Sequence, residues 1–162
     1  MARIHHSRTL AGLFCFFLAW ALPAMAQEAL RLHVTDGNGD TVTLDYDQLD
    51  ALPQSEFTTS TIWTDGTVQF SGVPLKALLD AVEVEGAVVE MIALNDYLVT
   101  LPYDELEEDV PLVATRMNGE YMSVRDKGPF WVVYPYDRHW RYRTETTYAQ
   151  SIWQLTRLNV VD

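Results

Sequence analysis

The chain of 162 residues contains a single cysteine, Cys15, which lies close to its start. With one thiol it can form no intramolecular disulfide. Everything after residue 15 also lacks a thiolate for a soft metal ion and a sulfur nucleophile for covalent catalysis. A hydrophobic core therefore has to hold the folded part together.

Basic side chains are also scarce, with 11 Lys and Arg against 23 Asp and Glu and a net charge of −12. Nucleic acid is not an expected partner, because phosphate binding needs a positive face. Only His33 and His139 follow residue 26. Since zinc needs three or four nitrogen or sulfur ligands, no metal site is predicted.

One long apolar run is present, from residue 10 to residue 22, with Arg3 and Arg8 before it and Ala24-Met25-Ala26 after it. This pattern predicts a signal peptide over residues 1–26, cleaved after Ala26, and a periplasmic or secreted protein. The alternative is an uncleaved anchor, but the run is shorter than the roughly 20 residues of a spanning helix.

The mature chain, residues 27–162, has the length of one domain, and no further run could span a bilayer. Loss of Arg3 and Arg8 leaves nine basic against 23 acidic side chains, a net charge of −14. An acidic, exported and soluble domain is expected.

Short alternating runs dominate the mature chain and predict a β-rich α+β domain with one main helix and short helical turns. The predicted strands cover residues 30–34, 41–44, 56–63, 68–70, 88–94, 97–101, 110–117, 121–124, 130–134 and 154–160. The helix is predicted to begin at Gly72-Val73-Pro74-Leu75 and to end at Gly86, with helical turns at 46–52, 102–106 and 144–152. Asn118-Gly119 predicts a type I′ hairpin turn.

Asp36, Asn38 and Asp40 have the first spacings of a calcium loop. Thr41 stands where such a loop needs glycine, and Asp47 stands where it needs a bidentate glutamate. A hairpin turn is the better interpretation, because Asp, Asn and Gly are turn residues.

Five motifs follow one another in the order of a known family. They are Phe70-Ser71-Gly72-Val73-Pro74-Leu75, Asn95-Asp96-Tyr97, Met117-Asn118-Gly119-Glu120, Gly128-Pro129-Phe130-Trp131 with Val132 to Pro135, and Ile152-Trp153-Gln154-Leu155. In these motifs the chain resembles the oxidoreductase molybdopterin-binding domain, the fold of sulfite oxidase. The resemblance implies a mixed, barrel-like β fold with a central cleft for a pterin.

The chain departs from this family at its metal ligand. In the family, a cysteine before the Gly-Val-Pro-Leu motif donates a thiolate to molybdenum. Here that place falls on Ser60, Thr61 and Ile62, which we call the metal-ligand position. Asp126-Lys127 and Ile152 replace the family's His-Gly and Lys. The leading hypothesis is a binding, sensory or accessory module without molybdenum. The alternative is a molybdopterin-dependent oxidoreductase with an oxygen ligand such as Ser60 or Thr61.

Six of the nine mature basic residues cluster within 28 positions, interleaved with aromatic residues. Guanidinium groups and aromatic faces together suit a planar anion. The predicted ligand-binding residues are Arg116, Arg125, Lys127, Tyr136, Arg138, Trp140 and Arg141. Their partner would be a small anionic ligand or an acidic group on an exported or membrane protein. The open alternative is that these cations pair with the many carboxylates and need no ligand.

Trp63, just beyond the metal-ligand position, has two interpretations. It either lines the former cofactor cleft or packs in the core, the commoner fate of a tryptophan on a strand. The segment from Trp131 to Tyr148 could likewise form an interface in a larger complex.

Overall fold

A computed structural model describes residues 30–162 of the chain. The strands are β1 (Leu32–Thr35), β2 (Thr41–Leu44), β3 (Ser55–Ser60), β4 (Thr67–Pro74), β5 (Val88–Ala93), β6 (Leu98–Pro102), β7 (Leu112–Met117), β8 (Glu120–Tyr121), β9 (Phe130–Val133) and β10 (Trp153–Val161). The α-helices are α2 (Tyr46–Asp50), α3 (Leu75–Ala81) and α4 (Glu145–Gln150). Single 3₁₀ turns are η1 (Tyr103–Glu105), η2 (Val124–Asp126) and η3 (Trp140–Tyr142). The predicted signal peptide lies outside the described residues.

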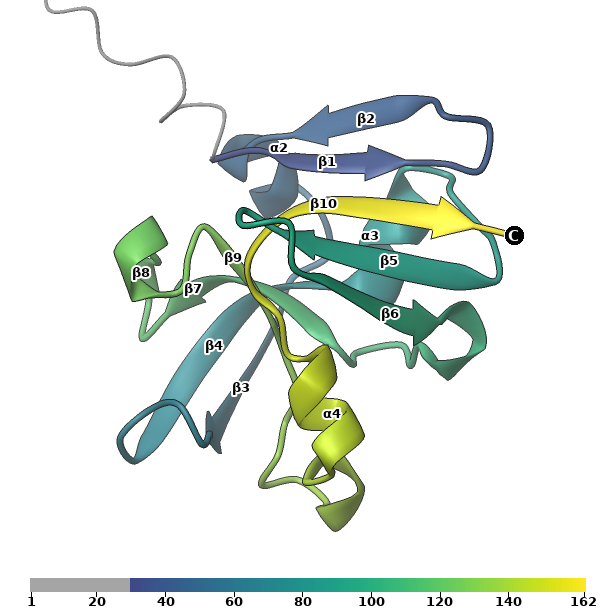
Figure 1. Cartoon of the computed structure of the whole chain (residues 1–162). Helices are drawn as coiled ribbons and strands as arrows, with labels where there is room; N and C mark the ends of the chain where they lie inside the picture. The colour runs from purple at the N-terminus through teal and green to yellow at the C-terminus, as the bar shows by residue number, and fades with distance from the viewer. Residues whose placement is uncertain (1–29) are drawn as a thin grey trace, which may run out of the picture.

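The strands form one sheet in the order β2-β1-β10-β9-β7-β4-β3, and β10 also pairs with β5, which pairs with β6. Figure 1 shows β2, β1, β10, β5 and β6 as one layer, with β3 and β4 running away from it. The β-rich α+β class is confirmed. The sheet is open and not closed into a barrel, because β2 and β3, at the two ends of this order, do not pair with each other.

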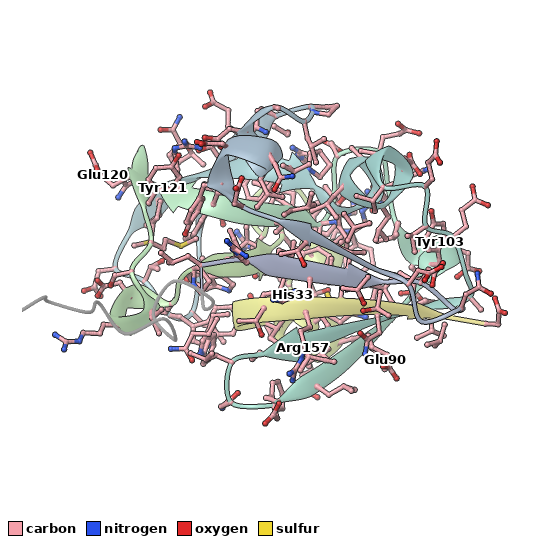
Figure 2. The ribbon with its side chains drawn as sticks, turned by 90° about the horizontal axis from the view of Figure 1, so that it is seen from above. His33, Glu90, Tyr103, Glu120, Tyr121 and Arg157 are labelled. Carbon is pink, nitrogen blue, oxygen red and sulfur yellow. The ribbon has the colours of Figure 1, made fainter. Side chains whose placement is uncertain are left out.

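The strand β10 joins the two parts of the sheet. Its first residues pair with β9, and its later residues pair in parallel with β1 on one edge and antiparallel with β5 on the other. In Figure 2, His33 on β1 and Arg157 on β10 lie on these neighbouring strands, which are in register at this pair.

The core has two hydrophobic clusters, and β9 contributes to both. Phe130 and Val132 belong to the larger cluster with the buried leucines of α3, whereas Trp131 and Val133 belong to the smaller one. Since all four side chains are fully buried, β9 is a strand buried on both faces, at the place where the sequence predicts a strand.

Both predicted hairpin turns are present. Asn118 and Gly119 have φ values of 52° and 83°, as a type I′ turn requires. The Asp36 carboxylate accepts hydrogen bonds from the backbone nitrogens of Asn38 and Asp40, at 3.0 and 2.8 Å, and so closes the β1–β2 turn.

The prediction that the helix begins at Gly72 is wrong by three residues. β4 continues through Pro74, and α3 begins at Leu75 and ends at Ala81, before Gly86. Gly72 pairs with Ala114 of β7, and a methyl group at Gly72 would lie 2.1 Å from the carbonyl oxygen of Val113. The glycine therefore serves close strand pairing. Within residues 30–162, no helix has the length and apolar character needed to span a membrane.

Candidate functional site

The metal-ligand position begins at Ser60, the last residue of β3. Ser60 is hydrogen-bonded to Asp137. The backbone nitrogen of Ser60 donates to Oδ2 of Asp137 at 2.5 Å, and the Ser60 hydroxyl donates to Oδ1 at 2.8 Å. The Asp137 nitrogen donates in return to the Thr59 hydroxyl at 3.0 Å. Two chain segments 77 positions apart are thereby joined at this point.

Arg143 completes this arrangement from the other side. Its Nη2 donates to Oδ1 of Asp137, and its Nε donates to the carbonyl oxygen of Tyr136 at 2.9 Å. The hydrogen bonds from the Ser60 backbone and hydroxyl, followed by the Arg143 guanidinium, hold the pKa of Asp137 below its usual value. Asp137 is therefore a carboxylate at neutral pH, and the Ser60 hydroxyl is committed to it as a donor.

The other two residues of the metal-ligand position offer no soft ligand either. The Thr61 hydroxyl lies 2.8 Å from the Thr64 hydroxyl and accepts from the Trp63 nitrogen at 3.0 Å. The Ile62 side chain is 65% exposed and has no ligand atom. Since residues 30–162 contain no cysteine, the described residues offer molybdenum no thiolate at this position.

Beside this position lies a cavity of about 290 Å³. Its wall comes from three parts of the fold: Trp63 after β3, Asn95 and Tyr97 in the β5–β6 turn, and the junction of α4 with β10. The residues of that junction are Tyr148, Ala149, Ser151, Ile152 and Trp153, and Ala93 completes the wall. Residues 95–97 and 152–153 belong to the motifs that carry the family resemblance, and Trp63 follows the metal-ligand position.

Trp63 is both a core residue and a wall of this cavity. Its half-buried ring packs against both hydrophobic clusters and lies 5.9 Å from the ring of Trp131. The same ring meets Tyr148 at 5.8 Å and Trp153 at 5.7 Å, at angles of 85° and 73°. Trp63 therefore packs against the core and also lines this cavity, while its place in a former cofactor cleft stays a prediction.

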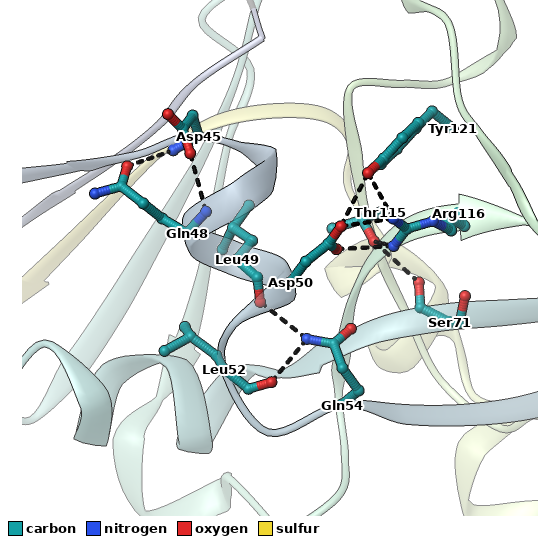
Figure 3. A network of polar contacts seen from close by, with 10 residues as sticks. All are labelled: Asp45, Gln48, Leu49, Asp50, Leu52, Gln54, Ser71, Thr115, Arg116 and Tyr121. Atoms are coloured by element: carbon teal, nitrogen blue, oxygen red, sulfur yellow. Dashed lines mark hydrogen bonds and ion pairs between the residues drawn. The ribbon is translucent and has the colours of Figure 1, made fainter.

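Among the predicted ligand-binding residues, Arg116 belongs to a polar network with α2. Its two terminal nitrogens donate to the two carboxylate oxygens of Asp50 at 2.8 and 2.6 Å, and the Tyr121 hydroxyl donates to Asp50 at 2.9 Å (Figure 3). The Asp45–Gln48 capping box fixes the helix that carries Asp50. Hydrogen bonding to the Arg116 guanidinium lowers the pKa of Asp50.

Arg138 and Arg141 lie elsewhere. They pair with Asp109 and Glu107, each at 2.7 Å, on the acidic segment that precedes β7. Arg116 stands near the end of β7, so the structure does not bring it together with Arg138 and Arg141.

The remaining predicted residues are dispersed as well. The Lys127 ammonium lies 5.5 Å from the Trp131 ring, whereas Arg125 on η2 and Trp140 on η3 are exposed. Tyr136 is buried, and its hydroxyl lies 2.6 Å from that of Ser151. Binding of an anion by this set stays a prediction.

A second hollow, of about 550 Å³, is acidic. Its carboxylates are those of Asp36, Asp80, Glu83, Glu85 and Asp162. Among residues 30–162, no three His, Cys, Asp or Glu side chains come together as a metal site.

Four residues of this region were not predicted from the sequence as site residues: Asp137, Asn95, Tyr97 and Tyr148. Asn95 and Tyr97 had a signal, since their tripeptide carries part of the family resemblance. Asp137 had none, because its role depends on its position opposite Ser60.

Comparison with known proteins supports the fold. The profile of the oxidoreductase molybdopterin binding domain matches residues 19–142. The crystal structure of the sulfane dehydrogenase SoxCD from Paracoccus pantotrophus is similar, with a TM-score of 0.62 and 18% sequence identity. The match covers 82% of this chain and 38% of that chain, and at this identity it shows the fold alone. No curated protein sequence matches the chain at a significant level.

Proposed function

Because the chain belongs to the oxidoreductase molybdopterin-binding domain family, we propose that it is a member that works without molybdenum, as an exported ligand-binding or sensory module. The fold and the family are the premise. The loss of the metal, the export and the binding role are the proposal.

The observation that carries the proposal is the Ser60–Asp137–Arg143 arrangement. An oxygen ligand to molybdenum would be the deprotonated Ser60 hydroxyl, which would lose its hydrogen bond to Asp137 and place a negative charge 2.8 Å from the Asp137 carboxylate. Removing that hydrogen bond would leave Asp137 with one donor fewer, which costs free energy, while Arg143 would still donate to it. The arrangement thus stabilises the domain without a metal in a place where the family uses a thiolate.

A partner surface is part of the same proposal. Arg138 and Arg141 are about half-exposed, and their pairs with Asp109 and Glu107 lie at the surface. Surface ion pairs contribute roughly 0–1 kcal/mol, so an acidic group on an exported or membrane protein can replace these carboxylates at little cost.

The test is the metal and pterin content of the protein purified from its native host. We expect background molybdenum and no pterin, both in the wild type and in Ser60→Ala. A cysteine-containing member of the family, purified in parallel, shows that the preparation retains the cofactor. One molybdenum per chain in the wild type would overturn the proposal and favour an oxidoreductase with an oxygen ligand. Loss of that metal in Ser60→Ala would identify the ligand.

A further inference from the structure

We propose that the cavity beside Trp63 binds a small organic cation, with a methylated ammonium group against its aromatic wall. This inference rests on the proposed function, because it assigns a ligand to the binding module proposed above. It adds the chemical class of the ligand.

The cavity has an aromatic wall. Trp63, Tyr97, Tyr148 and Trp153 all line the cavity. Trp63 stands at 85° to Tyr148 and at 73° to Trp153, so these rings form a corner and not a flat stack. Ring faces carry the negative part of the aromatic quadrupole, and several rings around one space are the usual site of quaternary ammonium groups.

The charges of the cavity lining and of the whole chain favour a cation over an anion. No Lys, Arg, Asp or Glu is among the lining residues, so a bound anion would lose its water without gaining a counter-charge. The net charge of −12 raises the local concentration of cations and lowers that of anions. Arg157, on the strand that Trp153 begins, is paired with Asp96. A cation is thus favoured by the wall and by the whole chain.

The cavity wall also contains the polar side chain of Asn95. Oδ1 of Asn95 accepts from the Tyr97 nitrogen at 3.2 Å, while its Nδ2 has no partner among the described residues. One amide donor beside an aromatic corner suits a ligand with an ammonium head and an oxygen at its other end. The volume of about 290 Å³ is at the small end for ligand sites, which also favours a small molecule over a peptide.

The experiment compares three probes of nearly the same shape. Choline is the cation, its carbon analogue with a tert-butyl group in place of the trimethylammonium is neutral, and tert-butylacetate is the anion. Binding to the full chain is measured by calorimetry and by tryptophan fluorescence, since Trp63 and Trp153 line the cavity. We expect choline to bind about tenfold more tightly than the neutral analogue, in line with a cation–π contribution.

Two variants locate the site. Trp153→Leu and Tyr97→Leu should each weaken choline binding by about fivefold or more. Tyr121→Leu is the matched control, because Tyr121 is as exposed as Tyr97, 49% against 55%, and does not line the cavity. If Trp153→Leu fails to fold, Tyr97→Leu decides.

Three results would overturn the inference: no choline binding, equal or tighter binding of the neutral or anionic probe, or choline binding that survives both cavity variants. The metal content of the same preparation separates this failure from that of the proposed function. If the protein is free of metal and does not bind choline, only the ligand class is wrong. If the protein carries molybdenum, both the proposed function and this inference are wrong.

Discussion

The Asp137 carboxylate accepts two hydrogen bonds from Ser60, at 2.5 Å from its nitrogen and 2.8 Å from its hydroxyl. Residues 77 positions apart in sequence therefore meet at Ser60, the first residue of the metal-ligand position. The pair predicts how a thiol would behave at this position.

Ser60→Cys, made in a Cys15→Ser background, should give a thiol whose pKa lies above the ordinary value of about 8.5, because a neighbouring carboxylate disfavours the thiolate. The measurement is the rate of alkylation as a function of pH. Adding Asp137→Asn should lower the midpoint towards the ordinary value. Identical midpoints with and without Asp137 would show that the carboxylate does not control this site.

Asp50→Asn should destabilise the protein by about 1–2 kcal/mol at neutral pH, since it breaks a partly buried, bidentate pair with Arg116. The folded-state pKa of Asp50 is lowered. Its contribution is therefore fully present above the ordinary pKa of 3.8 and is lost as the pH falls through the lower folded value.

Urea unfolding of the wild type and of Asp50→Asn at neutral and acidic pH tests this, and the two curves should converge in acid. Asp47→Asn, on the same helix and without an ion pair among the described residues, is the control. A constant difference at every pH would contradict the ion-pair explanation.

Gly72→Ala should cost more than about 3 kcal/mol or prevent folding, because the new methyl group would meet rigid backbone of β7. At Gly37 the nearest atoms would be 3.8 Å away, so Gly37→Ala should stay within about 0.5 kcal/mol of the wild type. Thermal or urea unfolding measures both. Equal effects at the two positions would refute the close pairing of β4 with β7.

Burial raises the pKa of both Tyr46 and Tyr136 to about 12, from an ordinary value of 10.0. The neutral hydroxyls thus contribute stability that is present below pH 10 and is lost as the pH rises through the folded value. In a titration followed by tyrosinate absorbance, these buried tyrosines should ionise at higher pH than ordinary tyrosines until the protein unfolds in alkali. Tyr46→Phe should have one fewer, and an unchanged number would contradict the burial of this hydroxyl.

Features set by neighbouring residues were predictable from the sequence. The Asn118-Gly119 turn depends on two residues that tolerate positive φ, and β9 shows its burial by four consecutive apolar residues. The family motifs gave the fold class for the same reason, since each is a short local pattern.

Features set by the topology were not predictable. The clustering of arginines in sequence suggested one basic site, but β7 separates Arg116 from Arg138 and Arg141, and each pairs with a carboxylate from another segment. The cavity likewise joins the β5–β6 turn to the start of β10, and no spacing along the chain encodes this neighbourhood.

The place of β10 between β1 and β5 has a consequence for biosynthesis. The strand β1 leaves the ribosome early, yet its parallel partner is the final strand of the described chain. Until that strand is made, β1 and its hairpin with β2 have no sheet to join, and a lone hairpin is marginally stable in water. The polypeptide therefore completes the native pairing of β1 only after translation has passed Asn159, the last residue of β10 that pairs with it.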